Sequence, residues 1–205
     1  IEIPLAIVLA DMENCGFMAD RNGIMEYNKE ISARLDEITK EIYDTVGYEF
    51  NINSPKQLGS ALFEKLALPH GKKTKSGYST SAEVLESLKY EHPAVALILQ
   101  YRTYSKLKST YCDGLLKVIG EDGRIHSSFN QTETRTGRIS STEPNLQNIP
   151  VRTELGRELR RFFIAKDGCV LVDADYSQIE LRVLAHIAND KAMIEAFKNN
   201  EDIHS

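Results

Sequence analysis

The sequence has no apolar run long enough to cross a membrane, and no basic leader. A transmembrane helix needs about 20 consecutive apolar residues, whereas the apolar N-terminal stretch is broken by Pro4, Asp11 and Glu13. Without a basic leader this stretch is not typical of a signal peptide. We therefore expect no membrane partner. The chain also begins without Met, which leads us to expect that it was excised from a longer protein.

Cysteines are few and far apart. Cys15, Cys112 and Cys169 form no Cys-x-x-Cys pair, and none has a histidine at zinc-finger spacing. Unpaired thiols are typical of a reducing compartment, so we expect a cytoplasmic protein. Cys15 and Cys169 lie among apolar residues, which predicts that both are packed in the interior.

Basic residues are in a minority, and the net charge of −5 by itself argues against a polyanionic partner. Their distribution is uneven, however. Residues 1–53 carry 11 acidic and 4 basic residues, whereas residues 54–111 carry 9 basic and 4 acidic residues. A basic segment favours a local nucleic-acid contact, and the alternative is an ordinary solvated helical face.

Apolar residues at spacings of three and four predict a helical first half. The stripe over residues 24–46 predicts one long amphipathic helix that ends at Gly47. A second helix over residues 93–109 could pair with it in antiparallel fashion. Three shorter helices are predicted over residues 4–14, 54–68 and 81–88, with Ser54 and Ser81 as N-caps of the last two.

Beyond Gly114 the pattern changes to short strands and polar loops. Residues 123–131 predict a strand, and residues 160–165 and 169–175 predict a hairpin closed by a Lys-Asp-Gly turn. A helix is expected to begin near Ile179. The sequence therefore predicts an α+β fold, with a helical part followed by a part that contains antiparallel strands.

Carboxylates follow the predicted buried strand in the sequence DADYSQIELR. Asp175 at the end of a strand would be held rigidly and would suit a divalent metal, although an aspartate that simply ends a strand is the alternative. Ser177 and Glu180 fit a capping box at the start of the next helix. Asp173 has no predicted partner, so we expect it to be solvated.

The segment QTETRTGRISSTEPNLQNIP, residues 131–150, is long, polar and irregular, which is typical of a functional loop or of a simple surface loop. Its arginines and amides can donate to the acceptors that every base pair presents in the minor groove. A loop with Lys72, Lys73 and Lys75 could contact phosphates. A helical row could add to them, with Arg102, Lys106, Lys108, Ser109 and Thr110.

Four segments together resemble bacterial family A DNA polymerases: SPKQLGSALFEKL, TETRTGRISS, EPNLQNIPVR and DYSQIELR. They occur in the order of the family and span nearly the whole chain. The resemblance implies a palm-side leading helix over residues 1–15, a thumb over 16–113 and the first part of the palm over 114–205. It also implies that the fingers and the rest of the palm are absent.

The resemblance implies template-directed DNA synthesis in replication and repair, from primer–template DNA and deoxynucleoside triphosphates, with two Mg²⁺ ions. Asp175 would bind both ions, Tyr176 would offer its carbonyl to one, and Glu180 would exclude ribonucleotides by crowding the sugar. The remaining implied nucleotide contacts are Arg152, Ser177, Gln178 and His204. The implied DNA contacts are Lys72, Lys73, Lys75, Lys106, Lys108, Ser109, Thr110, Thr134, Arg138, Ser140, Ser141, Asn145, Gln147 and Asn148.

The chain has no counterpart of the fingers helix or of the palm His-Asp-Glu triplet. We therefore expect the fragment to bind primer–template duplex but to be inactive alone, with the activity belonging to its parent. The alternatives are a non-catalytic duplex-binding module and, more weakly supported, a metal-dependent nuclease around Asp175 and Glu180. Unpaired strands at the open edges of an incomplete palm would also favour a non-native dimer.

Overall fold

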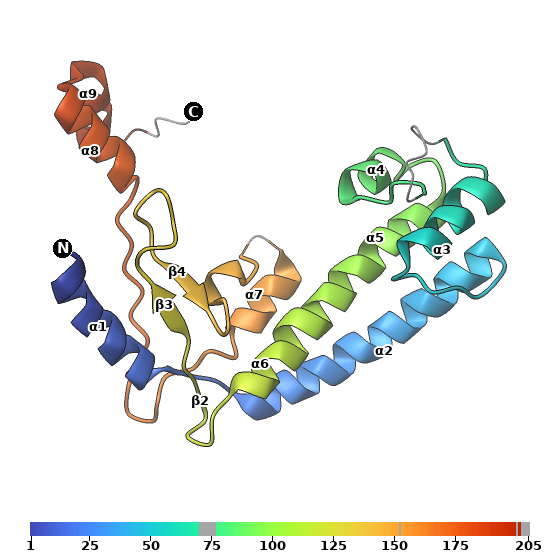
Figure 1. Ribbon diagram of the computed structural model, residues 1–205, viewed down its shortest axis with the longest axis horizontal. Coiled ribbons are helices and arrows are strands. Elements are labelled where there is room, and N and C mark those ends of the chain that lie inside the picture. Colours follow the sequence, from blue (N-terminus) through green and yellow to red (C-terminus); the bar gives the residue numbers. More distant parts are fainter. Residues whose placement is uncertain (70–76, 152, 200, 202–205) are drawn as a thin grey trace. The chain divides into compact units, whose positions relative to one another are not determined.

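A computed structural model describes residues 1–69, 77–151, 153–199 and 201 (Figure 1). The chain forms two compact units, residues 1–166 and residues 167–205. The fold is α+β as predicted, and the described ranges contain helices and two small antiparallel sheets. Within the described ranges, no helix is both long enough and apolar enough to span a bilayer.

Two long helices form the frame of the first unit, as the sequence predicted. Helix α2 (Arg21–Val46) begins at Asp20, whose carboxylate accepts a hydrogen bond from the Gly23 amide, and ends at Gly47 in the left-handed conformation. Helix α5 (Pro93–Lys106) lies beside it (Figure 1).

The second of these helices extends beyond its predicted end near residue 109. It continues through the π-helical turn η2 (Leu107–Cys112) into α6 (Asp113–Val118). Tyr111, Cys112 and Leu115 are buried in this extension, and their packing offsets the low helix propensity of Gly114. The predicted thumb–palm boundary therefore lies inside a continuous helix, and the division into thumb and palm stays a prediction.

Two apolar clusters show that the long helices run antiparallel. In the first cluster, Ile38 and Ile42 from the second half of α2 pack with Val95 from the start of α5. In the second cluster, Ile24 near the start of α2 packs with Leu115 of α6. The late part of one helix therefore meets the early part of the other, and shorter elements complete the first cluster.

The shorter helices of the first unit agree with the predicted ones. Ser54 accepts a hydrogen bond from the Gln57 amide and Ser81 accepts one from the Val84 amide, so both predicted N-caps are confirmed. Gly16 follows the first helix. These elements are α1 (Glu2–Cys15), α3 (Pro55–Gly59), the π-helical η1 (Ser60–Lys65) and α4 (Ala82–Ser87).

The sheets of the first unit are small. Strand β1 (Phe17–Met18) pairs antiparallel with β2 (Arg124–Ile125), and β3 (Ser128–Asn130) pairs antiparallel with β4 (Ser140–Thr142). The predicted strand over residues 123–131 is thus divided into two pieces that belong to different sheets. The division comes from the partners, because β1 and β4 approach the two halves separately.

The segment expected to be an irregular loop is partly ordered. It contains β4 and the 3₁₀ turn η3 (Leu146–Asn148), and it is followed by a helix that was not predicted, α7 (Glu154–Arg160). Thr153 caps this helix by accepting a hydrogen bond from the Gly156 amide. The short apolar pattern of α7 did not indicate a helix, because only Gly156 and Leu159 are buried.

The predicted hairpin of residues 160–165 and 169–175 is wrong. Phe163 instead forms an isolated antiparallel bridge with Ala19, and the Ile164 amide donates to the Met18 carbonyl at 3.0 Å. The second half, Cys169 to Val172, forms no strand, and Val170 is 81% exposed. A strand needs a neighbour for its backbone hydrogen bonds, and no described segment supplies one here.

The second unit contains α8 (Ile179–Ala188) and α9 (Lys191–Lys198), which pack against each other. The helix expected near Ile179 is confirmed. The Arg182 guanidinium lies 4.5 Å from the centre of the Phe197 ring. Cys169 in this unit and Cys15 in the first are exposed, so their predicted burial is wrong, whereas Cys112 is buried.

The predicted capping box at the start of α8 is also wrong. The N-cap is Gln178 in the left-handed conformation, with φ of 52°, and its side chain makes no capping hydrogen bond. The N-cap therefore lies one residue later than the capping box placed it, and Glu180 occupies the second position of α8 instead of the third. The Ser177 carbonyl accepts a hydrogen bond from Arg182 Nε at 2.8 Å.

Gly156 and Gly114 provide a test of the packing. A Cβ atom on Gly156 would lie 2.4 Å from the Pro150 carbonyl oxygen, whereas the nearest atom to one on Gly114 would be 3.7 Å away. We expect Gly156→Ala to lower the free energy of unfolding by about 1–3 kcal/mol. Gly114→Ala should raise it by up to about 1 kcal/mol through helix propensity. Denaturant titration measures both, and equal effects would contradict the close contact.

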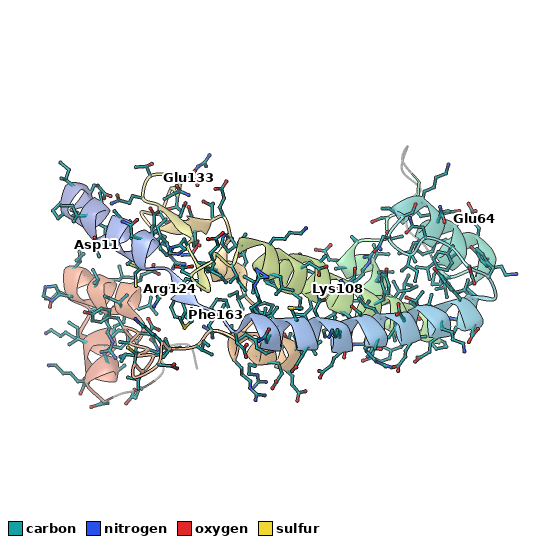
Figure 2. The ribbon with its side chains drawn as sticks, turned by 90° about the horizontal axis from the view of Figure 1, so that it is seen from below. Asp11, Glu64, Lys108, Arg124, Glu133 and Phe163 are labelled. Carbon is teal, nitrogen blue, oxygen red and sulfur yellow. The ribbon has the colours of Figure 1, made fainter. Side chains whose placement is uncertain are left out.

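His126 attaches the end of α1 to the turn before β2. Its Nδ1 lies 2.7 Å from the Glu13 carbonyl oxygen and its Nε2 lies 3.0 Å from Asp122 Oδ2. Arg124, labelled in Figure 2, donates to the Cys15 carbonyl beside it at 2.9 Å. Both partners of the imidazole are acceptors, so only the doubly protonated ring satisfies both.

This arrangement predicts a pH-dependent stability. The hydrogen bond to the Glu13 carbonyl, followed by the one to Asp122, raises the pKa of His126. A raised folded-state pKa stabilises the protein fully below about pH 6.5 and loses that contribution as the pH rises through the folded value. Thermal unfolding of wild type and His126→Gln should therefore differ most near about pH 6 and converge near about pH 9. A difference that stays constant with pH would contradict the role of the imidazolium.

Candidate nucleic-acid interface and catalytic carboxylate

Three amide side chains project from the turn η3 and its N-cap. Asn145, Gln147 and Asn148 are exposed, whereas Leu146 and Ile149 are half-buried and pack on the second apolar cluster. The apolar residues thus anchor the segment and leave the amides facing solvent. This is the arrangement expected of a surface that reads hydrogen-bond acceptors.

Two of these amides also make hydrogen bonds inside the segment. Asn145 Oδ1 accepts from the Gln147 backbone amide at 3.0 Å, and Gln147 Nε2 donates to the Ile139 carbonyl at 2.8 Å. The Asn145 carboxamide keeps its NH₂ group as a donor, because its oxygen alone is used in this contact. The backbone of the segment is held from the helical side, where Tyr111 Oη donates to the Asn148 carbonyl at 2.5 Å.

Ser141 does not lie where the sequence placed it. It was expected to contact DNA, but it is fully buried. Its hydroxyl lies 2.6 Å from that of Ser127 and accepts a hydrogen bond from the Leu146 amide at 3.2 Å. The strand β4 places its central side chain inward, which explains the burial. Neither Ser127 nor Tyr111 was singled out from the sequence, because a serine in a strand and a tyrosine in an apolar helical stripe carry no distinctive signal.

The neighbouring predicted DNA contacts remain at the surface. Arg138 is exposed, and Thr134 Oγ1 donates to its carbonyl. The Ser140 hydroxyl donates to Glu133 Oε2 at 3.3 Å. Thr134, Arg138 and Ser140 lie around the turn that leads into β4, and their role as DNA contacts stays a prediction.

A cavity of about 380 Å³ brings the helical row and the amide segment together. Lys106 and Thr110 line it from the long helix, and Asn145 and Asn148 line it from the other side. Lys106, Thr110 and both amides are exposed. Residues some 35 positions apart in sequence therefore present a cation, a hydroxyl and two amides to one site, which is a suitable composition for sugar, phosphate and base edges.

Other members of the helical row have partners within the protein. Lys108 is labelled in Figure 2, and its Nζ lies 2.9 Å from Asp113 Oδ2. This hydrogen bond is the main reason why the pKa of Asp113 is lowered, and Asn28 adds a further hydrogen bond. Arg102 donates to the Thr80 carbonyl at 2.6 Å, and burial lowers its pKa. Arg102 therefore supports the loop before α4 instead of facing a phosphate.

Ser109 has a similar internal role, because its hydroxyl donates to the Ser105 carbonyl at 2.8 Å. Its side chain is nevertheless exposed. Burial raises the pKa of Cys112 in the same helical segment to about 11, so this thiol stays protonated and unreactive at neutral pH.

The predicted catalytic carboxylate lies in the second unit. Asp175 and Tyr176 are exposed and precede α8 in a segment without regular structure, and Glu180 lies in the first turn of α8. Across the described residues, no group of three or more His, Cys, Asp or Glu side chains is arranged to hold a metal ion. The described residues therefore add no such group to Asp175, and Asp173 is exposed two residues before it.

Five predicted site residues lie outside the described residues. They are the loop lysines and two predicted nucleotide contacts, namely Lys72, Lys73, Lys75, Arg152 and His204.

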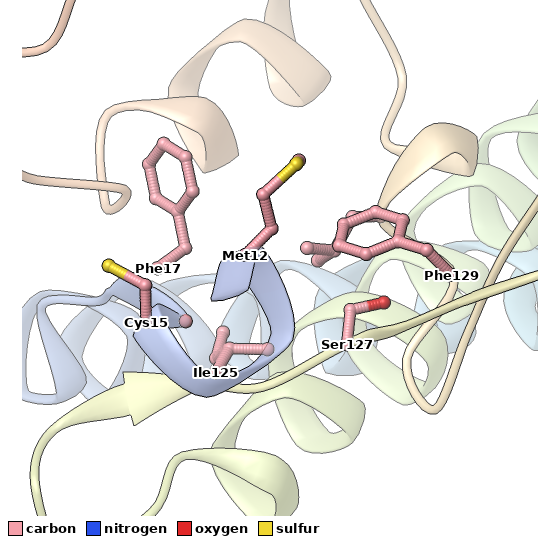
Figure 3. Close-up of a pocket in the computed structure, with 8 residues that line it drawn as sticks. Met12, Cys15, Phe17, Ile125, Ser127 and Phe129 are labelled. Carbon is pink, nitrogen blue, oxygen red and sulfur yellow. The ribbon is translucent and has the colours of Figure 1, made fainter. Parts of the chain in front are cut away.

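A second cavity, of about 220 Å³, lies between α1 and the strands β2 and β3 (Figure 3). Met12, Phe17 and Phe129 surround it, and Ser127 is the one lining residue with an oxygen-bearing side chain. That hydroxyl is already hydrogen-bonded to backbone carbonyls of Thr142 and Pro144. The cavity offers no further side-chain oxygen to orient a polar substrate, so it is not a candidate active site.

Comparison with known proteins identifies the family. The profile of DNA polymerase family A matches residues 21–205. DNA polymerase I of Caldicellulosiruptor bescii is 56% identical over the whole chain, and that of Bacillus subtilis is 54% identical; the chain spans 24% of the length of each relative.

A solved structure gives the same result. The POL domain of Pol1 from M. smegmatis, in complex with DNA primer-template and dNTP, is 44% identical with a TM-score of 0.87. The match covers the whole of this chain and 36% of that one. The chain therefore belongs to DNA polymerase family A.

Proposed function

We propose that the protein containing this chain is a DNA-directed DNA polymerase that adds deoxynucleotides to the 3′ end of a primer paired with a template. The observation that carries this proposal is the family match over residues 21–205. The complex with DNA primer-template and dNTP described for the M. smegmatis relative supports the same substrates here. Because the relatives are bacterial proteins named DNA polymerase I, we propose replication and repair in a bacterial cytoplasm as its setting.

The duplex contacts are proposed to lie around the cavity that joins the long helix to the amide segment. Asn145 and Asn148 would donate to minor-groove acceptors, which every base pair presents at purine N3 or pyrimidine O2. Lys106 would face a phosphate from the opposite wall. Such contacts bind duplexes of any sequence, as template-directed synthesis requires. Lys72, Lys73, Lys75, Lys108, Ser109, Thr110, Thr134, Arg138, Ser140 and Gln147 are proposed to extend this surface.

The family implies a divalent metal, and we propose that it is Mg²⁺. Asp175 and the Tyr176 carbonyl are hard oxygen ligands of the kind that Mg²⁺ prefers. One carboxylate and one carbonyl do not make a complete site, however, and the described residues form no acidic cluster around them. Two ions would need further carboxylates, so the complete site is expected to draw on parts of the polymerase beyond this chain.

This incompleteness favours a second function for the chain by itself. We infer that residues 1–205 alone bind primer–template duplex without extending it, since the described residues carry the proposed duplex surface but no metal cluster. Val170 and Val172 are more than 80% exposed. Strand pairing between two copies through this segment is a further property that we propose for the isolated chain.

The incoming nucleotide is proposed to lie against the start of α8. Glu180 occupies the first turn of that helix and is exposed. A carboxylate at the 2′ position of the sugar would exclude a ribonucleotide by steric conflict. Ser177, Gln178, Arg152 and His204 are proposed to complete the nucleotide contacts.

The proposal is tested by two neighbouring aspartates in the complete polymerase. Asp175→Asn should reduce kcat for primer extension by several orders of magnitude, because a metal ligand loses its charge. Asp173→Asn removes an equally exposed charge two residues away and should keep most of the activity. Single-nucleotide extension with magnesium measures both. Comparable losses, or none for Asp175→Asn, would remove Asp175 from the active centre.

Glu180 is tested through sugar selection in the same enzyme. We expect Glu180→Ala to raise ribonucleotide relative to deoxynucleotide incorporation at least tenfold, roughly the lower range of pocket discrimination. The ratio of the two kcat/KM values is the measurement, since general damage to the site largely cancels in it. The melting temperature of each enzyme, measured alongside, separates a change in sugar selection from a change in stability. An unchanged ratio would place the selection elsewhere.

A further inference from the structure

The backbone that carries the duplex-facing amides is held by three buried hydroxyl groups. Tyr111 is 6% exposed, Ser127 is 4% exposed and Ser141 is 0% exposed. Together they contact the carbonyls or amides of Pro144, Leu146 and Asn148. Ser127 and Ser141 are absent from the lining of the proposed duplex cavity, whereas Tyr111 lines it but uses its hydroxyl in the bond to the Asn148 carbonyl.

The two serines form a connected set of hydrogen bonds, in which either hydroxyl can donate to the other. The Leu146 amide donates to Ser141 Oγ at 3.2 Å, and the two hydroxyl oxygens lie 2.6 Å apart. The Pro144 carbonyl can accept from Ser127 Oγ at 2.7 Å or from Ser141 Oγ at 3.2 Å. These hydrogen bonds link the backbone groups of Pro144 and Leu146. Asn145 lies between those two residues, so the links fix the position from which its side-chain amide projects.

Tyr111 fixes the other end of the segment. Its ring belongs to the second apolar cluster, in which Ile24 and Leu115 are also buried, and its hydroxyl donates to the Asn148 carbonyl at 2.5 Å. The adjacent Thr110 lines the cavity together with Asn148. Tyr111 therefore sets the distance between the helical row and the amides on the opposite wall.

We propose that Tyr111, Ser127 and Ser141 are positioning residues for duplex recognition, whose hydroxyls bond to protein atoms and hold Asn145 and Asn148 in register with the helical row. The inference rests on the proposed function, because it assumes that these amides meet the minor groove. A hydrogen bond weakens steeply when its donor moves by as little as about 1 Å from its optimal position. Loss of a buried tether should therefore weaken duplex binding although every contacting side chain is still present.

The test uses the complete polymerase with Tyr111→Phe and Ser141→Ala. The dissociation constant for a matched primer–template should rise about threefold to tenfold in each, the range expected for one hydrogen bond. The slope of log Kd against log salt should not change, because no phosphate contact is lost. Titration of active binding sites separates weaker binding from a smaller folded fraction.

Matched controls remove equivalent hydrogen bonds elsewhere in the first unit. Tyr27 Oη donates to the Leu155 carbonyl at 3.2 Å, and Ser32 Oγ donates to the Asn28 carbonyl at 2.7 Å. Neither carbonyl belongs to the amide segment, so Tyr27→Phe and Ser32→Ala should bind the duplex as wild type does. If they weaken binding as much as Tyr111→Phe and Ser141→Ala, the effect is general destabilisation and the positioning role is wrong.

Asn148→Ala separates this inference from the proposed function. If Asn148→Ala weakens binding but Tyr111→Phe and Ser141→Ala do not, the amide contacts the duplex and the tethers do not position it. If Asn145→Ala and Asn148→Ala also bind as wild type does, the proposed interface itself fails and the positioning role fails with it. Weakening by all four variants, with unchanged salt slopes for the two tether variants, is the expected result.

Discussion

The antiparallel packing of α2 against α5, η2 and α6 is the interaction on which the proposed duplex surface depends. It buries two apolar clusters, and the second of them also contains Leu159 of α7 and supports Leu146 and Ile149. The amide segment has few apolar residues of its own, so it takes its position from this helical pair. Removing that support would leave the amides on an unanchored loop, whose conformational entropy would oppose any defined contact.

The π-helical turn η2 contributes to the same arrangement. A π turn accommodates one additional residue and changes the faces that the following side chains occupy. Within it, Leu107, Tyr111 and Cys112 are buried while Ser109 and Thr110 are exposed. The turn thus separates a row that packs on α2 from a row that faces the cavity. Such interruptions of helices are frequent at functional sites.

The second unit has a different balance. Its two helices bury Ala185 and Phe197, whereas Val170, Val172 and Ile187 remain exposed. An apolar segment at the surface is not stabilised by burial, so this segment would gain regular structure only from a neighbour. The chain spans 24% of the length of each of the two relatives compared above.

The sequence by itself determined the features that local interactions control. The stripe over residues 24–46, the caps at Ser54 and Ser81 and the stop at Gly47 depend on groups within a few residues of each other. The motif DYSQIELR indicated the family, because this particular order of residue types resembles a motif of that family. These signals need no knowledge of distant neighbours.

Only the tertiary structure decided which side chains are available for function. Ser141 is buried because β4 pairs with β3, and Lys108 is engaged because Asp113 lies on the next turn of a helix that was expected to end earlier. Residues 169–172 form no strand because a strand requires a hydrogen-bonding neighbour, which apolar composition cannot supply. Whether a side chain is available and whether a strand finds a partner both depend on groups distant in sequence. Packing of the folded chain decides which of these groups meet.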